Sequence, residues 1–372
     1  MKKLTPSFVV LVLLLVLNAS LFADDSESKL ERIRVSADGS HFVGATTGNR
    51  FIVWGVNYDH NHDGLLLEDY WHDQWDTVVD DFREIKRLGC NVVRIHLQFS
   101  KFMKTTDKPD SQNLKQLNRL ITLAEQTKLY LDITGLGCYH KQDVPAWYDD
   151  LNEGMRWEAQ SRFWAEVAKI CKRSPAIFCY DLMNEPIIGG AAPQSEWLAG
   201  ELGGKHFVQR ITLTPGERSR ELIAKAWVER LAKSIRNDDQ QTMITVGVIP
   251  WAHTWPNAKP LFHDPVVGKP LDFVAVHFYP KKGNIKGSLE AIKVYDVGKP
   301  LVIEEMFPLK CSLKEMDEFI DGSQDFTDGW VSFYWGKTAE ENSQAGDIRG
   351  AMMAQWLEYW QSKSQELLQA TD

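Results

Sequence analysis

Two segments that lie far apart in the sequence each end in carboxylates. Residues 176–186 (AIFCYDLMNEP) begin as a run of strand-forming residues and end in Asn-Glu-Pro. Pro186 cannot continue a central strand, because it has no N–H group to donate to the sheet. Residues 299–308 (KPLVIEEMFP) also read as a strand, and this one ends in Glu304 and Glu305. Glutamates at the ends of two buried strands predict a pair of carboxylates in one cleft, suited to acid–base chemistry.

Further polar side chains stand at the ends of the other predicted strands. If the strands are parallel, their carboxyl ends meet on one face, and these side chains share one cavity. Carboxylates, a guanidinium, imidazoles, a phenol and an indole together suit acid–base work on a polyhydroxyl substrate. The residues at the strand ends are Asn57, Arg94, His96, Asn184, Glu185, His277, Tyr279, Glu304, Glu305 and Trp335.

Apolar patterning predicts eight strands with helices between them. Alternation of this kind is typical of a parallel sheet with helical crossovers. The expected strands are 51–58, 91–97, 129–134, 176–185, 242–248, 273–278, 299–305 and 329–335. The expected helices are 75–88, 112–126, 157–172, about 215–237 with a capping box that begins at Thr214, and 348–361. Residues 187–213 are expected to form a long loop.

Eight strands and about 250 core residues predict an α/β fold of the (β/α)8 TIM-barrel type in a single domain, residues 24–372. The alternative is an open, doubly wound sheet. That alternative is less favoured, because no GxGxxG turn follows the first strand.

Residues 1–23 have the pattern of a secretory signal peptide. Lys2 and Lys3 precede an apolar stretch of ten residues, 8–17, which is too short to span a bilayer, and small residues near position 23 allow cleavage there. We therefore expect a secreted or periplasmic protein that is not held in a membrane once the signal is removed, and we expect a monomer.

Charge and composition exclude some partners. A net charge of −9 without a basic stripe argues against nucleic-acid binding. The 14 tryptophans suit the stacking of sugar rings, as well as other flat ligands. The five cysteines (Cys90, Cys138, Cys171, Cys179 and Cys311) show no CxxC spacing, so buried free thiols are expected, although an oxidising compartment would permit a disulfide.

His60, His62, Asp63 and His72 form a cluster of metal-ligating residue types. Zinc sites require defined ligand spacing and a supporting second layer of contacts, and an HxH pair in a loop is more typical of solvated or substrate-lining residues. We therefore expect no metal and no cofactor.

The sequence resembles glycoside hydrolase family 5, a cellulase- and mannanase-like family in a clan of retaining barrel hydrolases. The strings that carry the resemblance are RFWAEVAKICKRSPAIFCYDLMNEP, VAVHFYP and GKPLVIEEMF, and it extends from about Phe51 to Trp335. The order of the Asn-Glu-Pro strand, the His-x-Tyr strand and the strand-seven glutamate makes it a fairly specific set.

The resemblance implies roles for the strand-end residues. Glu185 would be the general acid/base, and Glu304 or Glu305 the nucleophile. Glu305 is favoured, because adjacent strand residues point to opposite faces and Glu305 is the last before the chain turns. The substrate-binding residues implied with them are Arg94, which holds the nucleophile ionised, and His96, Asn184, His277, Tyr279, Trp335 and Asn57.

Two positions depart from the family pattern. Strand three ends in Thr134 where many members have a histidine, and His140 in the following loop could substitute for it. Met306 and Phe307 follow the nucleophile strand where the family has an aromatic residue and then a glycine. These departures leave the subfamily, and with it the sugar, open.

The resemblance and the residues together predict a secreted retaining endo-β-glycanase that hydrolyses a β-linked polysaccharide, a β-mannan or a β-glucan, by double displacement. Two alternatives are an exo-acting glycosidase or transglycosylase on oligosaccharides, and a non-catalytic carbohydrate-binding barrel. The presence of both glutamates argues against the last of these.

Overall fold

The computed structural model describes residues 30–256 and 258–369, so the predicted signal peptide lies outside the described residues. One compact unit begins at Glu31 and contains all the helices and strands below. None of the described helices is both long and apolar enough to cross a membrane.

Parallel strands form a nearly closed barrel, so the predicted TIM-barrel fold is confirmed. In barrel order the strands are β4 (Val53–Asn57), β5 (Val92–Gln98), β6 (Tyr130–Gly137), β7 (Ile177–Asp181), β11 (Met243–Thr245) with β12 (Gly247–Val248), β13 (Val274–His277), β14 (Leu301–Met306) and β15 (Gly329–Ser332). Every pairing between them is parallel, and β15 pairs with β4.

The fifth barrel strand is divided in two. β11 pairs with β7 and β12 pairs with β13, with Val246 between them. The Val246 carbonyl contacts Nε2 of His263 at 2.9 Å. The break frees the Gly247 N–H to donate to a carboxylate of the site, Asp181.

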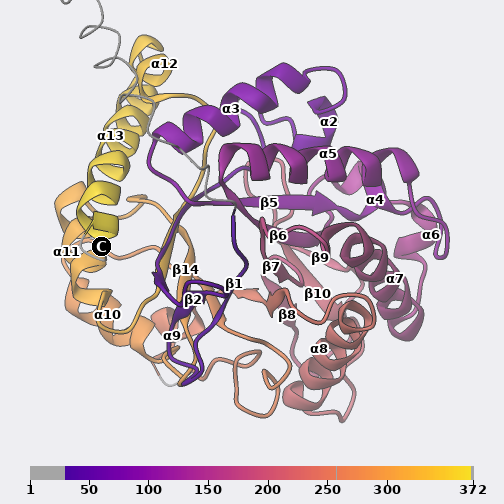
Figure 1. The fold of residues 1–372 in the computed structure, drawn as a ribbon. Coiled ribbons are helices and arrows are strands. Elements are labelled where there is room, and N and C mark those ends of the chain that lie inside the picture. The colour runs from indigo at the N-terminus through magenta and orange to yellow at the C-terminus, as the bar shows by residue number, and fades with distance from the viewer. Residues whose placement is uncertain (1–29, 257, 370–372) are drawn as a thin grey trace, which may run out of the picture. The chain divides into compact units, whose positions relative to one another are not determined.

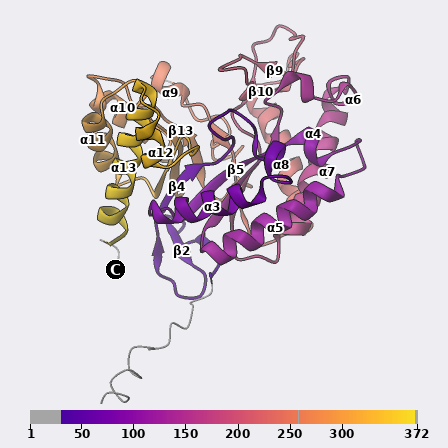
Figure 2. The same ribbon diagram turned by 90° about the horizontal axis from the view of Figure 1, so that it is seen from above.

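Amphipathic helices surround the barrel (Figures 1 and 2). The longer ones are α3 (Trp75–Arg87), α5 (Ser111–Thr127), α7 (Glu153–Cys171), α8 (Arg220–Arg236), α10 (Ile285–Lys293), α11 (Leu313–Ser323) and α13 (Ile348–Gln369). Single turns or short helices lie in the connections: α2 (Leu67–Tyr70), α4 (Phe99–Phe102), η2 (Lys141–Asp143), α6 (Ala146–Asp149), α9 (Trp251–Thr254) and α12 (Ala339–Gln344). α13 runs eight residues beyond its predicted end.

The predicted start of α8 is wrong. The Thr214 capping box does not form, because Gly216 has a φ of 60° and so leaves the helical region. The helix begins instead at Arg220, where the Ser219 side chain accepts a hydrogen bond from the Leu222 N–H.

Residues 187–213 are not the structureless loop that was expected. They carry a three-stranded sheet of β8 (Pro186–Ile188), β9 (Leu198–Ala199) and β10 (Val208–Thr212). The strands have two to five residues each, too short to show a clear alternation in the sequence. This sheet holds the segment 200–208 in place.

A second small sheet lies across the barrel end where the strands begin (Figure 1). It consists of β1 (Ile33–Val35), β2 (Phe42–Gly44) and β3 (Arg50–Phe51). Phe42 of β2 packs edge-on against Phe178 and Phe273, with ring centroids 5.2 Å apart in both cases. Apolar packing thus closes this end of the barrel, and the polar site forms at the other.

Gly55 in β4 has no room for a side chain, because a Cβ there would lie 2.6 Å from the Val92 carbonyl oxygen of β5. We predict that Gly55→Ala lowers the free energy of unfolding by about 1–3 kcal/mol through overpacking. The matched control is Gly154→Ala in α7, where a Cβ meets its nearest neighbour at 3.6 Å. Gly154→Ala should be neutral or stabilise by about 0.5 kcal/mol, as urea unfolding would measure. Equal effects at both positions would contradict the packing argument.

Candidate active site

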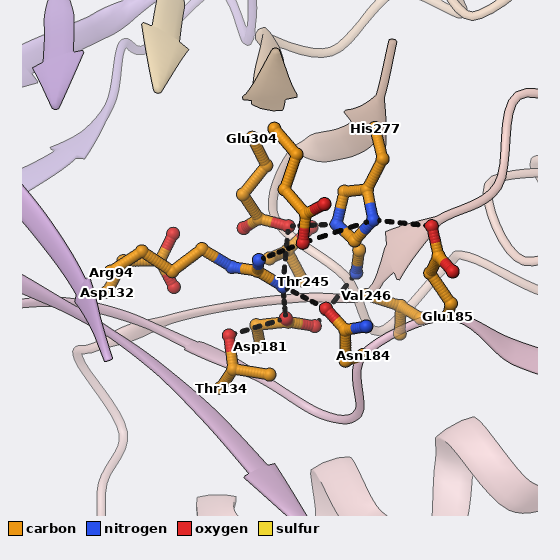
Figure 3. A network of polar contacts seen from close by, with 12 residues as sticks. Arg94, Asp132, Thr134, Asp181, Asn184, Glu185, Thr245, Val246, His277 and Glu304 are labelled. Atoms are coloured by element: carbon orange, nitrogen blue, oxygen red, sulfur yellow. Dashed lines mark hydrogen bonds and ion pairs between the residues drawn. The ribbon is translucent and has the colours of Figure 1, made fainter. Parts of the chain in front are cut away.

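Arg94, at the centre of β5, is the hub of the polar network at the carboxyl ends of the strands. Its side chain is fully buried. Nη1 donates to Asn57 Oδ1 at 2.9 Å and to Glu305 Oε1 at 2.8 Å. Nη2 donates to Asp181 Oδ2 at 2.8 Å and to Asn184 Oδ1 at 2.9 Å. One guanidinium therefore joins four side chains from β4, β14 and the end of β7, and Figure 3 shows it in the middle of this network.

The two adjacent glutamates of β14 point in different directions. Glu304 is wholly buried inside the barrel, with Oε2 at 3.6 Å from Arg94 Nη2 and 3.5 Å from His277 Nε2. Glu305 is 7 % exposed and lines the cleft above the barrel. This is the alternation expected of neighbouring residues in a strand, and it leaves Glu305 as the β14 carboxylate within reach of a substrate.

Glu185 lies just beyond the end of β7, in a turn that aims its side chain across the cleft. Its φ of 47° lies in the left-handed region, which is uncommon for a residue with a long side chain. The turn is held by a hydrogen bond from the Glu185 N–H to the Gly247 carbonyl at 2.9 Å. Carboxylate oxygens of Glu185 and Glu305 and a ring nitrogen of His277 all lie within 4.8 Å of one another.

His277, at the end of β13, touches three carboxylates. Its Nδ1 lies 2.9 Å from Glu185 Oε1 and 3.5 Å from Glu305 Oε1. Burial by itself disfavours an imidazolium, but the charge of Glu305 and the contacts to Glu185 and Glu304 outweigh it and raise the pKa of His277 to about 10. His277 is therefore the second buried cation of the site at neutral pH.

Glu305 has a second hydrogen-bond donor besides Arg94. The Tyr279 hydroxyl donates to Oε2 at 2.9 Å, so each oxygen of this carboxylate has one fixed partner. Burial raises the pKa of Glu305 above its usual value, the neighbouring Glu185 charge adds to that rise, and His277, Arg94 and Tyr279 oppose it.

Two further carboxyls lie inside the barrel, on Glu304 of β14 and on Asp132 of β6, and their protonation states differ. Burial disfavours the charged form of both. For Glu304, Arg94 and His277 overcome that cost and lower the pKa to about 2. For Asp132, the Glu304 charge adds to burial and raises the pKa well above the usual range. Asp132 is therefore a neutral acid beside an ionised Glu304, and it also accepts a hydrogen bond from the Cys179 thiol at 3.1 Å.

His96 of β5 lies beneath the network, contacts Asn57 and is only 1 % exposed. Burial and the nearby charge of Arg94 lower its pKa well below the usual value, so the ring is neutral. Asn57 donates through Nδ2 to the carbonyls of Glu304 and Ser332, so its Oδ1 is an acceptor, and His96 Nε2, at 3.0 Å, must donate to it. His96 Nδ1 then accepts from the Tyr139 hydroxyl, which fixes the tautomer.

A cleft of about 910 Å³ opens above the network. Of the predicted site residues, Asn184, Glu185, Tyr279 and Glu305 line it, while Arg94, Asn57, His96 and His277 support them from beneath.

Trp335 is 2 % exposed and is absent from the lining, because β15 ends at Ser332 and the chain brings Phe333 and Tyr334 to the cleft first. His140 lies in a separate small pocket beside Tyr139 and Gln98.

Sequence reasoning missed four groups that complete the site. Asp181 accepts from Thr134 Oγ1 and from the Gly247 N–H, both at 2.8 Å, besides Arg94. Asp181 and Asp132 each interrupt a run of strand-forming residues, which is a usable signal of a buried carboxyl with a partner. Phe333 and Tyr334 carried no such signal, because aromatic residues are common in buried strands.

The His60, His62, Asp63 and His72 cluster separates in the structure. His60 pairs with Asp59 at 2.8 Å, His62 with Asp63 at 3.1 Å, and His72 contacts Asn113 at 2.8 Å. All five cysteines are free thiols, and four are buried, with Cys311 partly exposed.

Comparison with known proteins identifies the family. The family model for cellulase (glycosyl hydrolase family 5) matches residues 46–367. The chain belongs to glycoside hydrolase family 5. It is therefore a glycoside hydrolase of a retaining family. A search of the curated proteins found no match.

Solved structures with the same fold come from several enzymes. An exo-β-1,4-mannosidase from Opitutaceae bacterium strain TAV5 superposes with a TM-score of 0.64 at 16% identity over 90% of this chain, which spans 63% of that protein. A β-1,4-D-mannanase from Cryptopygus antarcticus gives 0.63 at 15% identity, over 90% and 94% of the two chains. The catalytic domain of a Thermobifida fusca endoglucanase gives 0.58 at 15% identity, over 90% and 98%. At these identities the likeness shows the fold alone.

We predict that Arg94→Met lowers the free energy of unfolding at pH 7 by about 3–5 kcal/mol, because it leaves buried carboxylates without their counter-ion. The difference in the free energy of unfolding between the variant and the wild type should become smaller as the pH falls. In the wild type, ionised Glu304 contributes to the free energy of unfolding, and this contribution is lost only as pH falls from 4.5 towards the folded pKa of about 2. In the variant, the carboxyls that have lost Arg94 take up protons at higher pH. Their protonation removes the unpaired buried charge, so the variant approaches the wild type. Urea unfolding from pH 7 to pH 4 measures this. A deficit that is constant with pH would show that Arg94 acts through packing alone.

Proposed function

We propose that the chain hydrolyses a β-glycosidic bond by double displacement, with Glu305 as nucleophile and Glu185 as general acid/base. The observation that carries this proposal is the closeness of the two carboxylates, whose oxygens lie within 4.8 Å. Retaining glycosidases have carboxyl groups about 5–5.5 Å apart, whereas inverting ones need about 6.5–9.5 Å to admit a water molecule.

Each neighbouring group has a defined part in the two steps. Arg94 and Tyr279 hold one Glu305 oxygen each, which orients the carboxylate for attack on the anomeric carbon and stabilises its charge. Glu185 gives its proton to the leaving oxygen and then, as a base, activates the water that releases the sugar. His277 Nδ1 contacts Oε1 of Glu185 at 2.9 Å and so holds this carboxyl in place beside Glu305.

Asn184 and Phe333 would hold the sugar. Asn184 is fixed between Arg94 and the Phe207 carbonyl, to which its Nδ2 donates at 2.9 Å, and it lines the cleft together with Glu185. It would hydrogen-bond the sugar 2-hydroxyl, a contact that strengthens in the transition state. Phe333 takes the place at the cleft that the sequence suggested for Trp335 and offers the apolar face on which a ring can lie.

The sugar is proposed to be β-linked mannose or glucose, supported by the mannosidase, mannanase and endoglucanase named among the similar structures. Endo-action on a β-mannan or β-glucan and exo-action on oligosaccharides are the two modes, and product lengths separate them: endo-action releases mixed oligosaccharides early, exo-action a single product. Export from the cell is proposed from the N-terminal signal pattern.

Glu305→Gln should lower turnover by at least about 10³-fold while the protein stays folded, because the amide cannot form the glycosyl-enzyme. Reducing-sugar release from mannans, glucans and their oligosaccharides measures this. The matched control is Glu304→Gln, which leaves the nucleophile in place. Full activity of Glu305→Gln would exclude it as the nucleophile.

Glu185→Ala should still react with an aryl β-glycoside whose leaving group needs no protonation, and then stall as the glycosyl-enzyme. Azide should restore turnover and yield a β-glycosyl azide, because a small anion fills the space of the carboxylate and needs no base. NMR of the product gives the anomeric configuration. An α-glycosyl azide, or no effect of azide on a folded protein, would contradict this role.

A further inference from the structure

The cleft beside Glu185 and Glu305 has a wall of exposed aliphatic side chains. Nine large hydrophobic side chains are well exposed in the described part of the chain, and four of them line this one cleft. They are Leu202 (75 % exposed), Leu309 (64 %), Ile348 (81 %) and Met352 (49 %). Leaving these side chains in water is unfavourable, and their gathering at one site indicates a ligand that covers them.

The wall is built from three separate parts of the chain. Leu202 comes from the segment before β10, Leu309 from the connection after β14, and Ile348 and Met352 from the first turns of α13. The last two are four residues apart in the helix, so they share one face. Met353 and Val208 continue the wall. Contributions from such distant segments show that the fold assembles this surface.

Aromatic residues anchor the base of the wall. Phe207 packs against Tyr139 and Phe333, with ring centroids 4.9 Å and 6.5 Å apart. Phe307 packs edge-on against the buried Trp356 at 5.7 Å. The cleft lining beside the aliphatic side chains is therefore tied to the buried part of the protein.

The chemistry of this wall does not suit a sugar chain. Sugars bind through hydrogen bonds to hydroxyl groups and by laying ring faces on flat aromatic side chains. Phe and Tyr residues such as Phe333 and Tyr334 supply such faces elsewhere in the cleft, but the four exposed side chains of the wall are all aliphatic. Leu, Ile and Met offer no hydrogen-bonding groups and no flat face. The polar lining residues that belong to the Arg94 network, Asn184, Glu185, Tyr279 and Glu305, gather where the glycosidic bond would be cut.

We propose that the natural substrate carries an aliphatic aglycone, an alkyl chain attached through the β-glycosidic bond, and that this chain lies along the wall formed by Leu202, Leu309, Ile348 and Met352. The inference rests on the proposed function and names its leaving group. The glycone of any glycoside carries hydroxyl groups on most of its carbons, so the apolar part of the substrate is the aglycone. Flexible aliphatic side chains adapt to an alkyl chain, as methionine does at other apolar binding surfaces.

Chain-length dependence tests this proposal on the whole protein. The probes are methyl, butyl and octyl β-mannosides and β-glucosides, used below the concentration at which octyl glycosides form micelles. We expect kcat/KM to rise by about 10- to 100-fold from methyl to octyl, since each methylene fully removed from water strengthens binding roughly fourfold and an open cleft removes it only in part. If the enzyme hydrolyses these glycosides with the same kcat/KM for all three chain lengths, the proposal is overturned and the proposed function stands. Inactivity on all glycosides and glycans would instead reject the proposed function.

A binding measurement gives a second readout that does not depend on turnover. Octyl and methyl β-thioglycosides resist hydrolysis, and isothermal titration compares their affinities. The octyl compound should bind at least about 10-fold more tightly, with a more negative heat-capacity change. Equal affinities would overturn the proposal.

Variants locate the effect on the wall. The double variant Leu202→Gln/Ile348→Gln changes two exposed side chains and should reduce the octyl-to-methyl ratio of kcat/KM by about 3- to 10-fold. The matched control is Leu222→Gln, an equally apolar side chain on α8 that is 55 % exposed and lies outside the cleft lining, and it should keep the wild-type ratio. An unchanged ratio in the double variant would overturn the assignment.

Sedimentation of the same variants tests whether a second copy of the chain occupies the wall. A wild-type dimer that the double variant dissociates, together with a flat chain-length series, would assign the wall to self-association and overturn the proposal. A sedimentation coefficient that is unchanged by the variants, together with the chain-length rise, supports the alkyl site.

Discussion

The site depends on a single buried cation that satisfies several carboxylates at once. Arg94 reaches Glu305 and Asp181 at 2.8 Å and Glu304 at 3.6 Å, and all four residues are buried. Ionised carboxylates in such a place are tolerable only when paired and hydrogen-bonded. A guanidinium has the fork of donors to serve them together, which a lysine would lack. Barrel closure places Arg94 at the centre of those strands, so fold and site are stabilised by the same contacts.

Charge balance explains the protonation states around Arg94. His277 supplies the second positive charge, with a pKa raised to about 10, and Asp132 stays neutral because its pKa is raised well above the usual range. Arg94 and His277 thereby keep Glu304 ionised inside the barrel, while Glu305 takes the position at the cleft. Two neighbouring glutamates thus differ in accessibility through strand alternation, and the accessible one lies beside Glu185.

The sequence predicted the barrel well, because eight apolar runs separated by amphipathic helices leave few alternatives. Strand ends also predicted Arg94, Glu185, His277 and Glu305 as neighbours, since parallel strands bring their carboxyl ends together. The aliphatic wall of the cleft could not be predicted from the sequence in this way. Leu202 and Ile348 reach it through a small sheet of very short strands and through the start of α13, neither of which leaves a periodic signal at the cleft. Trp335 illustrates the same limit, because the exact end of β15 decides which aromatic residue faces the substrate.

Covalent trapping tests the central claim most directly. A 2-deoxy-2-fluoro β-glycoside with a good leaving group slows the second displacement, so that a retaining enzyme accumulates as its glycosyl-enzyme. Mass spectrometry of the intact protein, followed by peptide mapping, identifies the labelled residue. The geometry predicts one sugar per chain, attached to Glu305, with no labelling of Glu305→Gln. A label on Glu304, or none on a protein that turns over the parent glycoside, would contradict the account.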